Sequence, residues 1–510
     1  MGIDWLAAPD YYLARLVILR GLGVIYLVAF VVALRQFRPL LGERGLLPVP
    51  RYVRVAGWSR APSLFTLRYS DRLLAVVAWS GVALSAAVVA GLVERAPAGV
   101  SMLVWFVLWA LYLSIVNVGQ TFYAFGWESL LLEAGFLAIF LGPADFAPPT
   151  LVILMLRWLV FRVEVGAGLI KMRGDSCWRD LTCLYYHHET QPMPNPLSWW
   201  FHHLPASLHR VEVAANHTTQ LAVPFLLFAP QPYASVAGGL MIVTQGWLVL
   251  SGNFSWLNVV TMTIAVSALD NRALELVLPA APPATLADPP LWFSGIVIAL
   301  AAGVAVLSWW PARNLLSRRQ AMNLSFNRFH LVNTYGAFGT ISRERYEVVI
   351  EGTDDPAITE DTVWREYEFT GKPGDPRRRP PQVAPYHLRL DWLMWFAALS
   401  PGYAEPWLPR LAGKLLEGDP ATVRLLRRGG NPFPDRPPAF VRALLYRYRF
   451  TTGPERRATG AWWTRTEVGV YLPPVTMPTP ASSGRTDASP STPSRATGSS
   501  EPPAPGARGG

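Results

Sequence analysis

The polar residues best suited to chemistry gather in one stretch of the chain, residues 171–210 and the few positions after it. Imidazole is a good ligand for zinc, copper and iron, so a metal site is the first interpretation to consider. No His-x-x-x-His or Glu-x-x-His pair fixes two ligands on one helical face, and adjacent histidines point in divergent directions. We therefore predict hydrogen-bonded histidines near a membrane surface, with no metal and no cofactor. Six of the eight histidines lie here: His187, His188, His202, His203, His209 and His217.

The same stretch holds the only two cysteines, Cys177 and Cys183. Their close spacing is compatible with a local disulfide, which would place this loop on the oxidising side of a membrane. The spacing alone leaves a free pair open. A redox-active pair is less favoured, because Cys-x-x-Cys spacing and a helix N-terminus are both missing.

Charged residues also occur inside an apolar segment just before this loop. Arg157, Glu164 and Lys171 recur every seven residues and share one helical face, whereas Arg162 lies off that stripe. A charge at the centre of a bilayer costs at least about 2.5 kcal/mol, so each needs a partner. We predict that Arg157 and Glu164 pair with other helices, with Glu133 as a candidate partner, and that Lys171 extends to the interface. A working polar cavity is the alternative, and no residue is assigned as catalytic.

The composition of the chain places these residues in a membrane. Of its 510 residues 51% are hydrophobic and only 16% are charged, and a spanning helix needs about 20 mostly apolar residues. We predict a polytopic α-helical membrane protein with about nine transmembrane helices. Five segments are clear, and four are shorter or more polar. The clear ones are residues 16–34, 73–93, 100–118, 150–170 and 291–310, and the others are 127–141, 211–229, 233–250 and 257–269.

The chain divides into three parts. Residues 1–310 form the helical bundle with its large polar loop at 171–210, and residues 311–475 form a small mixed α+β domain that is soluble or interfacial. Residues 476–510 are rich in Pro, Ser, Thr, Ala and Gly and are predicted to be a disordered tail.

The net charge and the motifs of the chain narrow the classes of function that we expect. The net charge is +10, but the basic residues lie beside apolar segments, where they meet lipid headgroups, so we expect membrane lipid and no nucleic acid as a partner. No Gly-x-Ser-x-Gly motif is present, so the protein is not predicted to be a lipase. Lysine is nearly absent beside arginine, a bias typical of GC-rich genomes, and we expect a bacterial source.

Several long motifs carry a family resemblance over residues 10–475. The chain resembles the lipase maturation factor family in NVGQTFYAFGWESLLLEAGF from Asn117, RWLVFRVEVGAGLIKMRGDSCWRDLTCLYYHHETQPMPNPLSWW from Arg157, NTYGAFGTISRERYEVVIEGT from Asn333, WREYEFTGKPGDPRRRPPQVAPYHLRLDWLMWFAAL from Trp364 and NPFPDRPPAFVRALLYRYRFT from Asn431. Matching positions in the loop are Arg173, Asp175, Trp178, Asp180, His187, Asn195 and His217. Those in the C-terminal domain are Asn333, Tyr335, Gly336, His387, Arg389 and Asp391, which we interpret as structural, with Arg389 and Asp391 organising a turn.

The resemblance implies a multi-pass protein that helps secreted lipases reach their active fold, as a folding or assembly factor rather than an enzyme. Its partner would be a secreted client, such as a lipase. The compartment would be the endoplasmic reticulum in animals and the plasma membrane in bacteria. The client would contact aromatic residues near the membrane, for which the candidates are Trp199, Trp200, Phe201, Trp392 and Trp395.

An enzyme is the alternative function. The order of the two parts distantly resembles the vitamin K-dependent carboxylase family. In that case Lys171, Glu164 and the histidines would line a substrate cavity, with a desolvated Lys171 acting as a base.

Two signals disagree about membrane orientation. Residues 35–72 hold eight arginines against Glu43 and Asp71, and the positive-inside rule would place them in the cytoplasm together with the C-terminal domain. The resemblance and the cysteines favour the opposite orientation. We follow the resemblance and interpret residues 35–72 as an interfacial segment.

Overall fold

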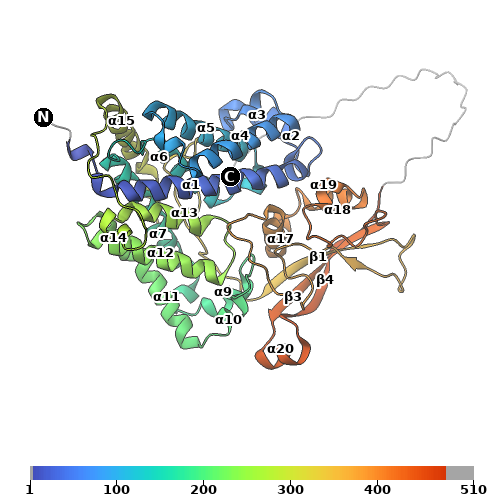
Figure 1. Cartoon of the computed structure of the whole chain (residues 1–510). Coiled ribbons are helices and arrows are strands. Elements are labelled where there is room, and N and C mark those ends of the chain that lie inside the picture. Colours follow the sequence, from blue (N-terminus) through green and yellow to red (C-terminus); the bar gives the residue numbers. More distant parts are fainter. Residues whose placement is uncertain (1–3, 478–510) are drawn as a thin grey trace, which may run out of the picture.

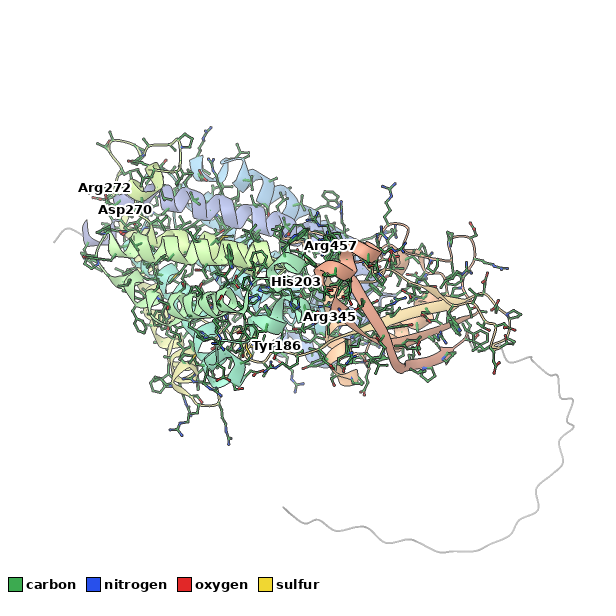
Figure 2. All side chains as sticks on the ribbon, turned by 90° about the horizontal axis from the view of Figure 1, so that it is seen from below. Tyr186, His203, Asp270, Arg272, Arg345 and Arg457 are labelled. Atoms are coloured by element: carbon green, nitrogen blue, oxygen red, sulfur yellow. A yellow bond between two sulfur atoms is a disulfide. The ribbon has the colours of Figure 1, made fainter. Side chains whose placement is uncertain are left out.

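The computed structural model describes residues 4–477, so the predicted tail lies outside the described residues except for its first two positions. A helical bundle carries a smaller domain at one end, built on a four-stranded sheet (Figure 1). Asp270 and Arg272 lie at the far end of the bundle, whereas His203 and Arg345 lie where the bundle meets the sheet (Figure 2). This layout agrees with the predicted membrane bundle and α+β domain.

Within residues 4–477, five helical stretches are long and apolar enough to cross a membrane. They pack closely where small residues allow it. Gly81 is one example, because the Phe30 ring occupies the space that a β-carbon would fill and so brings α4 against α1. The stretches are Pro9–Leu41, which contains α1 (Tyr12–Leu41), then α4 (Asp71–Val89), α5 (Ala98–Asn117), α12 (Tyr233–Ser251) and Leu291–Leu316, which contains α15 (Leu291–Leu307) and α16 (Trp309–Leu316).

The prediction of nine spans is not confirmed. The other four predicted segments fall on α6 (Gly126–Ala138), α7 (Thr150–Arg173), α11 (Ala206–Leu221) and α13 (Leu257–Ala265). At 1.5 Å per residue, α6 and α13 are shorter than the roughly 30 Å hydrocarbon layer. Helix α7 is long enough but carries Arg157, Arg162 and Glu164 within its apolar part. Helices α6, α7 and α13 are mostly buried inside the bundle, whereas most of α11 is not buried.

The polar loop and the connections form short helices. The loop contains α8 (Ser176–Arg179), α9 (Leu184–Thr190) and α10 (Ser198–His202). Asp175 caps α8 by accepting a hydrogen bond from the Cys177 amide at 3.1 Å. Elsewhere lie α2 (Val49–Arg60), α3 (Leu64–Leu67) and α14 (Asn271–Glu275).

The C-terminal domain is an antiparallel sheet of order β2-β1-β3-β4. The strands are β1 (Arg345–Thr353), β2 (Arg365–Glu366), β3 (Phe440–Phe450) and β4 (Trp463–Val475), with Val349 opposite Leu444 and Tyr448 opposite Arg465. The helices are α17 (Arg389–Leu399), α18 (Leu408–Leu416), α19 (Pro420–Val423) and α20 (Gly453–Thr459). Buried side chains of this domain, including Val348 and Trp392, continue the hydrophobic core of the bundle. The two parts therefore share one core.

Two buried carboxylates on α6 bind the C-terminal chain to the bundle. Arg389 donates to Glu128 at 2.8 Å and to the Phe122 carbonyl at 2.8 Å. The Glu128 and Arg389 side chains are both 0% exposed. Tyr112 also donates to Glu128. Around this pair, Gln36 on α1 donates to the His387 carbonyl at 2.6 Å and accepts from the Arg389 amide at 2.9 Å.

The second carboxylate, Glu133, pairs with Arg162 on α7. It also accepts hydrogen bonds from the Asn333 amide at 2.9 Å and the Tyr335 hydroxyl at 2.7 Å. Arg162 in turn donates to the Asn333 carbonyl at 2.6 Å. The segment that enters the C-terminal domain is thus fixed between α6 and α7.

Arg389→Ala tests the first of these attachments, because it leaves the Glu128 carboxylate buried without its cation. We expect a loss of about 3–5 kcal/mol of stability, the usual cost of breaking a buried ion pair from one side. The measurement is the thermal unfolding midpoint of the purified protein in detergent. The control is Arg447→Ala, whose pair with Glu344 is 53% and 47% exposed and should contribute little. Equal midpoints for the two variants would contradict the assignment.

Candidate functional site

A large cavity lies between the bundle and the C-terminal domain. Its volume is about 1160 Å³, at the upper end of the range for pockets that enclose small ligands. Helices α7, α11 and α12 supply one part of its wall, and the loop and α17 supply another. Most of the lining is apolar and aromatic, including Phe254, Trp392, Trp395, Phe396 and Tyr403.

Two of the charged side chains that line this apolar space, Glu164 and Lys171, lie on α7. Glu164 accepts a hydrogen bond from Gln245 at 2.8 Å, and Gln245 accepts from Asn258 at 2.7 Å. The Lys171 ammonium donates to Asn216 at 2.8 Å and to Gln220 at 2.9 Å. All of these except the Asn216 amide belong to side chains that are nearly fully buried. The arrangement can orient the polar end of an amphiphilic molecule whose remainder is apolar.

The contacts of the charged residues on α7 match the prediction only in part. Lys171 does not extend to the interface, because it is 6% exposed and reaches α11 instead. Arg157 donates to the backbone carbonyls of Ser267 and Leu227, both at 3.0 Å. The partner of Glu133 is Arg162, which lies off the stripe. Glu164 and Lys171 therefore line the cavity, whereas Arg157 and Arg162 hold neighbouring segments of the bundle to α7.

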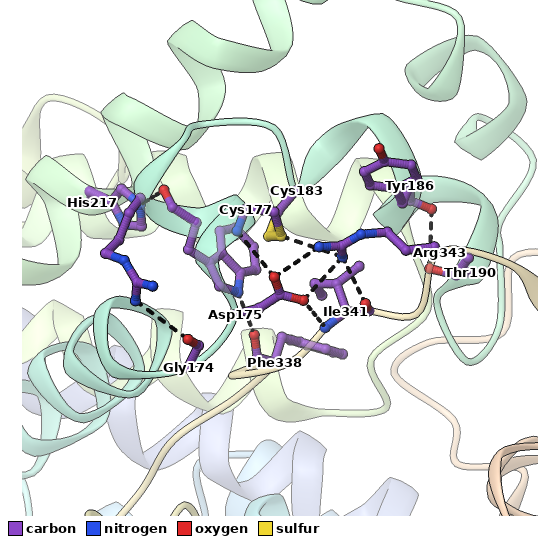
Figure 3. The surroundings of a disulfide bond; sticks show 12 residues. Gly174, Asp175, Cys177, Cys183, Tyr186, Thr190, His217, Phe338, Ile341 and Arg343 are labelled. Carbon is purple, nitrogen blue, oxygen red and sulfur yellow. Dashed lines mark hydrogen bonds and ion pairs between the residues drawn. A yellow bond between two sulfur atoms is a disulfide. The ribbon is translucent and has the colours of Figure 1, made fainter. Parts of the chain in front are cut away.

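Cys177 and Cys183 are joined in a disulfide (Figure 3). Beside it, Arg343 donates to Asp175 at 2.8 Å, and this guanidinium holds the pKa of the carboxyl below its usual range. Trp178 donates to the Phe338 carbonyl at 2.8 Å. These contacts attach the loop to the chain that enters the sheet domain.

The remaining loop positions of the family pattern are also structural contacts. Arg173 donates to the Gln320 side chain at 2.6 Å, and Asn195 donates to the Leu250 carbonyl at 3.0 Å. His217 bonds to the Trp178 carbonyl at 3.0 Å. His187 packs between the rings of Phe254 and Phe338 and faces the cavity. Asp180 lies exposed at the end of α8.

The C-terminal pattern residues are structural too, but not in the turn that we predicted. Arg389 reaches into the bundle toward Glu128, whereas Asp391 accepts from the Gly371 amide at 2.6 Å. The two side chains diverge because they are two positions apart at the start of a helix. Gly336 donates its amide to Asn323 at 3.2 Å and packs closely on Met322, so a β-carbon there would require Met322 to shift by a few tenths of an ångström.

Sequence reasoning missed two groups. Glu128 gave no signal of its own, because its partner Arg389 is remote in sequence. The second group is His188, His209 and Glu212, whose ligand atoms all lie within 4.8 Å of one another. Its signal is a His-x-x-Glu spacing, which places His209 and Glu212 on one face of α11. This spacing differs from the His-x-x-x-His and Glu-x-x-His patterns that were sought in the sequence.

Comparisons with known proteins cover both parts of the chain. The model of the lipase maturation factor transmembrane domain matches residues 13–276, and that of the lipase maturation factor C-terminal domain matches residues 331–473. Lipase maturation factor 1 of Homo sapiens is 42% identical, over 92% of this chain and 88% of its own. The Bos taurus protein of that name is 44% identical, over 92% and 90%. Lipase maturation factor 2 of Homo sapiens is 29% identical, over 92% and 83%. No solved structure matches.

The buried Asp391 predicts a pH effect on stability. Burial raises its pKa to about 6, against the opposing hydrogen bond from Gly371, whereas the unfolded chain titrates near pH 3.9. The folded protein therefore holds the extra proton, and stability falls as the pH rises through the window from about 4 to 6. Between pH 5 and pH 7 this loss amounts to about 1 kcal/mol.

Asp391→Asn should remove this loss, because the amide oxygen still accepts from Gly371 and cannot ionise. The unfolding midpoint is measured at pH 5 and pH 7 for the native chain, for this variant and for Asp361→Asn, which changes an exposed acid. We expect a smaller pH difference in the first variant only. An unchanged difference would show that Asp391 does not titrate in this range.

Proposed function

The chain belongs to the lipase maturation factor family, and on this basis we propose that it assists secreted lipases in reaching their active folded state. The main support for this proposal is that both family domains are present, in order. Over 92% of its length the chain is 42% identical to lipase maturation factor 1 of Homo sapiens. The function is that of a folding or assembly factor. The client is a secreted protein, with lipases as the first candidates.

The geometry supports binding rather than covalent chemistry. The disulfide loop, the sheet domain and the apolar cavity lie together at one end of the bundle. Trp200 is 40% exposed and Tyr403 is 54% exposed, so both present aromatic surface there. Trp392 is only 3% exposed because its ring packs on Trp127. It is therefore no longer a candidate for contact with the client. Trp199, Phe201 and Trp395 are half-buried and remain candidates.

The proposed orientation places the sheet domain on the oxidising side of the membrane. Residues 35–72 lie at this same end, since Gln36 donates to the His387 carbonyl and the Leu46 carbonyl accepts from Arg410 of α18 at 2.8 Å. Helix α2 exposes Val55 (81%) and Trp58 (55%) among its arginines. This pattern supports an interfacial helix that binds headgroups, so the arginines need not mark the cytoplasm.

The compartment follows from the source of the chain. The relatives are animal proteins, which supports the endoplasmic reticulum and gives no support to the bacterial source expected from composition. A bacterial chain would occupy the plasma membrane in the same orientation. Nothing in the comparisons favours the carboxylase-like alternative.

The direct test is the ratio of active to total secreted lipase in cells with and without this gene. Antibody quantifies the lipase, and ester hydrolysis measures its activity. We expect the ratio to fall on deletion and to return on complementation, while a secreted enzyme that is not a lipase keeps its specific activity. If the ratio stays constant for every secreted lipase of the host, the proposal fails.

Lys171→Met separates a folding factor from an enzyme. A folding factor should lose only part of its function, because the cavity keeps its shape and only the ammonium contacts to Asn216 and Gln220 are lost. An enzyme that uses Lys171 as a base should fall to the level of the deletion strain. The same lipase ratio is the readout, with the variant's abundance and melting behaviour as controls. A fall to the deletion level in a folded, client-binding variant would refute the non-enzymatic interpretation.

A further inference from the structure

Three potential metal ligands converge where the polar loop meets α11. His188 lies on α9, and His209 and Glu212 lie on one face of α11. Their ligand atoms all fall within 4.8 Å of one another. The His209 Nδ1 and Glu212 Oε2 atoms are 3.1 Å apart, close to the spacing of about 3.3 Å between two ligands of one tetrahedral zinc ion. Only the His188 ring has to move closer, by side-chain rotation.

His188 is the unexplained member of this group. Its side chain is buried in a residue that is 3% exposed, yet neither ring nitrogen has a hydrogen-bond partner among residues 4–477. Buried polar atoms are almost always paired, so an unpaired ring at this position calls for a ligand. Its neighbours are the rings of His209 and Phe201, both with centroids at 5.5 Å.

The outer contacts of the other two ligands are already in place. The Trp247 indole donates to Glu212 Oε1 at 2.8 Å, which leaves Oε2 directed at His209. The far nitrogen of His209, Nε2, lies 3.4 Å from the His202 carbonyl, which leaves Nδ1 directed at Glu212. Metal-binding histidines and carboxylates are usually held by such outer hydrogen bonds.

We propose that His188, His209 and Glu212 bind a divalent transition metal, and zinc fits the set best. Two neutral imidazoles and one carboxylate are the ligands of open zinc sites, in which a fourth position remains for water or another ligand. His188 and Glu212 both line the large cavity, so that fourth position faces it. The ion fixes α9 against α11 and so shapes the rim of the cavity. This site is independent of which client the protein serves.

The test uses the full-length protein in detergent, stripped with a chelator and then given ZnSO₄ before gel filtration. Elemental analysis should find about one zinc ion per chain, as expected for a single three-ligand site. His209→Gln and Glu212→Gln should each weaken zinc binding by at least about ten-fold. His203→Gln, which removes an exposed histidine, should bind zinc like the native chain.

Trp247→Phe tests the outer contact, because it keeps an aromatic ring against Phe201 and removes only the donor to Glu212. We expect a loss of about 10–100-fold in zinc affinity with an unchanged melting midpoint of the stripped protein. At the same zinc concentration, the rise in midpoint should be largest for the native chain and His203→Gln, and smaller for the two ligand variants and Trp247→Phe. Equal zinc content in the native chain and both ligand variants, or none in the native chain, would overturn the site. Stoichiometric iron in the protein as purified, before the chelator, that is lost in the same two ligand variants would keep the site and overturn its assignment to zinc.

Discussion

The architecture depends on two carboxylates that α6 buries within the bundle. Glu128 and Glu133 are 0% and 3% exposed, and they lie five positions apart on the helix, so they point to different sides of α6. Neither can stay charged in an apolar interior without a cation. Arg389, from the C-terminal part of the chain, supplies one cation, and Arg162 on α7 supplies the other. Arg389 therefore brings the C-terminal chain back to α6, and Asn333 and Tyr335 add a second contact there by donating to Glu133. These two contacts place the sheet domain.

The same requirement keeps the cavity open. Asn333 and Tyr335 occupy the space beside Glu133, and Arg389 begins the helix that carries the aromatic wall of the cavity. On the other side, Arg345 of β1 donates to the Glu189 carbonyl at 2.9 Å and the Pro192 carbonyl at 3.2 Å, and Arg343 binds Asp175 beside the disulfide. The loop and the sheet are held apart from α7 by contacts at their edges. The apolar space between them is a consequence of these attachments, and Gln245, itself held by Asn258, donates to the Glu164 carboxylate that faces it.

Local patterns in the sequence predicted the elements but not the partners. Long apolar runs predicted α1, α4, α5, α12 and α15, and strand-like patterns at residues 346–351 and 446–450 predicted β1 and the second half of β3. Heptad spacing correctly placed Glu164 and Lys171 on one face of α7, but periodicity does not say which neighbour that face meets. Arg162, judged to be off the stripe, proved to be the partner of Glu133. A third strand-like pattern at residues 363–369 proved to be only the two-residue β2, and β4 was not predicted, because pairing partners rather than composition define these strands.

The buried pairs also bear on what counts as a folding unit. The two family domains, residues 13–276 and 331–473, are separate as sequence patterns. Physically, Glu128 lies in the first and Arg389 in the second, and the hydrophobic core runs through both. Either half alone would bury a charge without its partner or expose the surface that the other half covers, and both alternatives are costly. A buried ion pair adds little net stability over apolar packing, but it strongly disfavours any arrangement in which the pair is broken. These pairs thus act mainly to specify one arrangement of the two halves, and the unit that folds is the bundle together with its sheet domain.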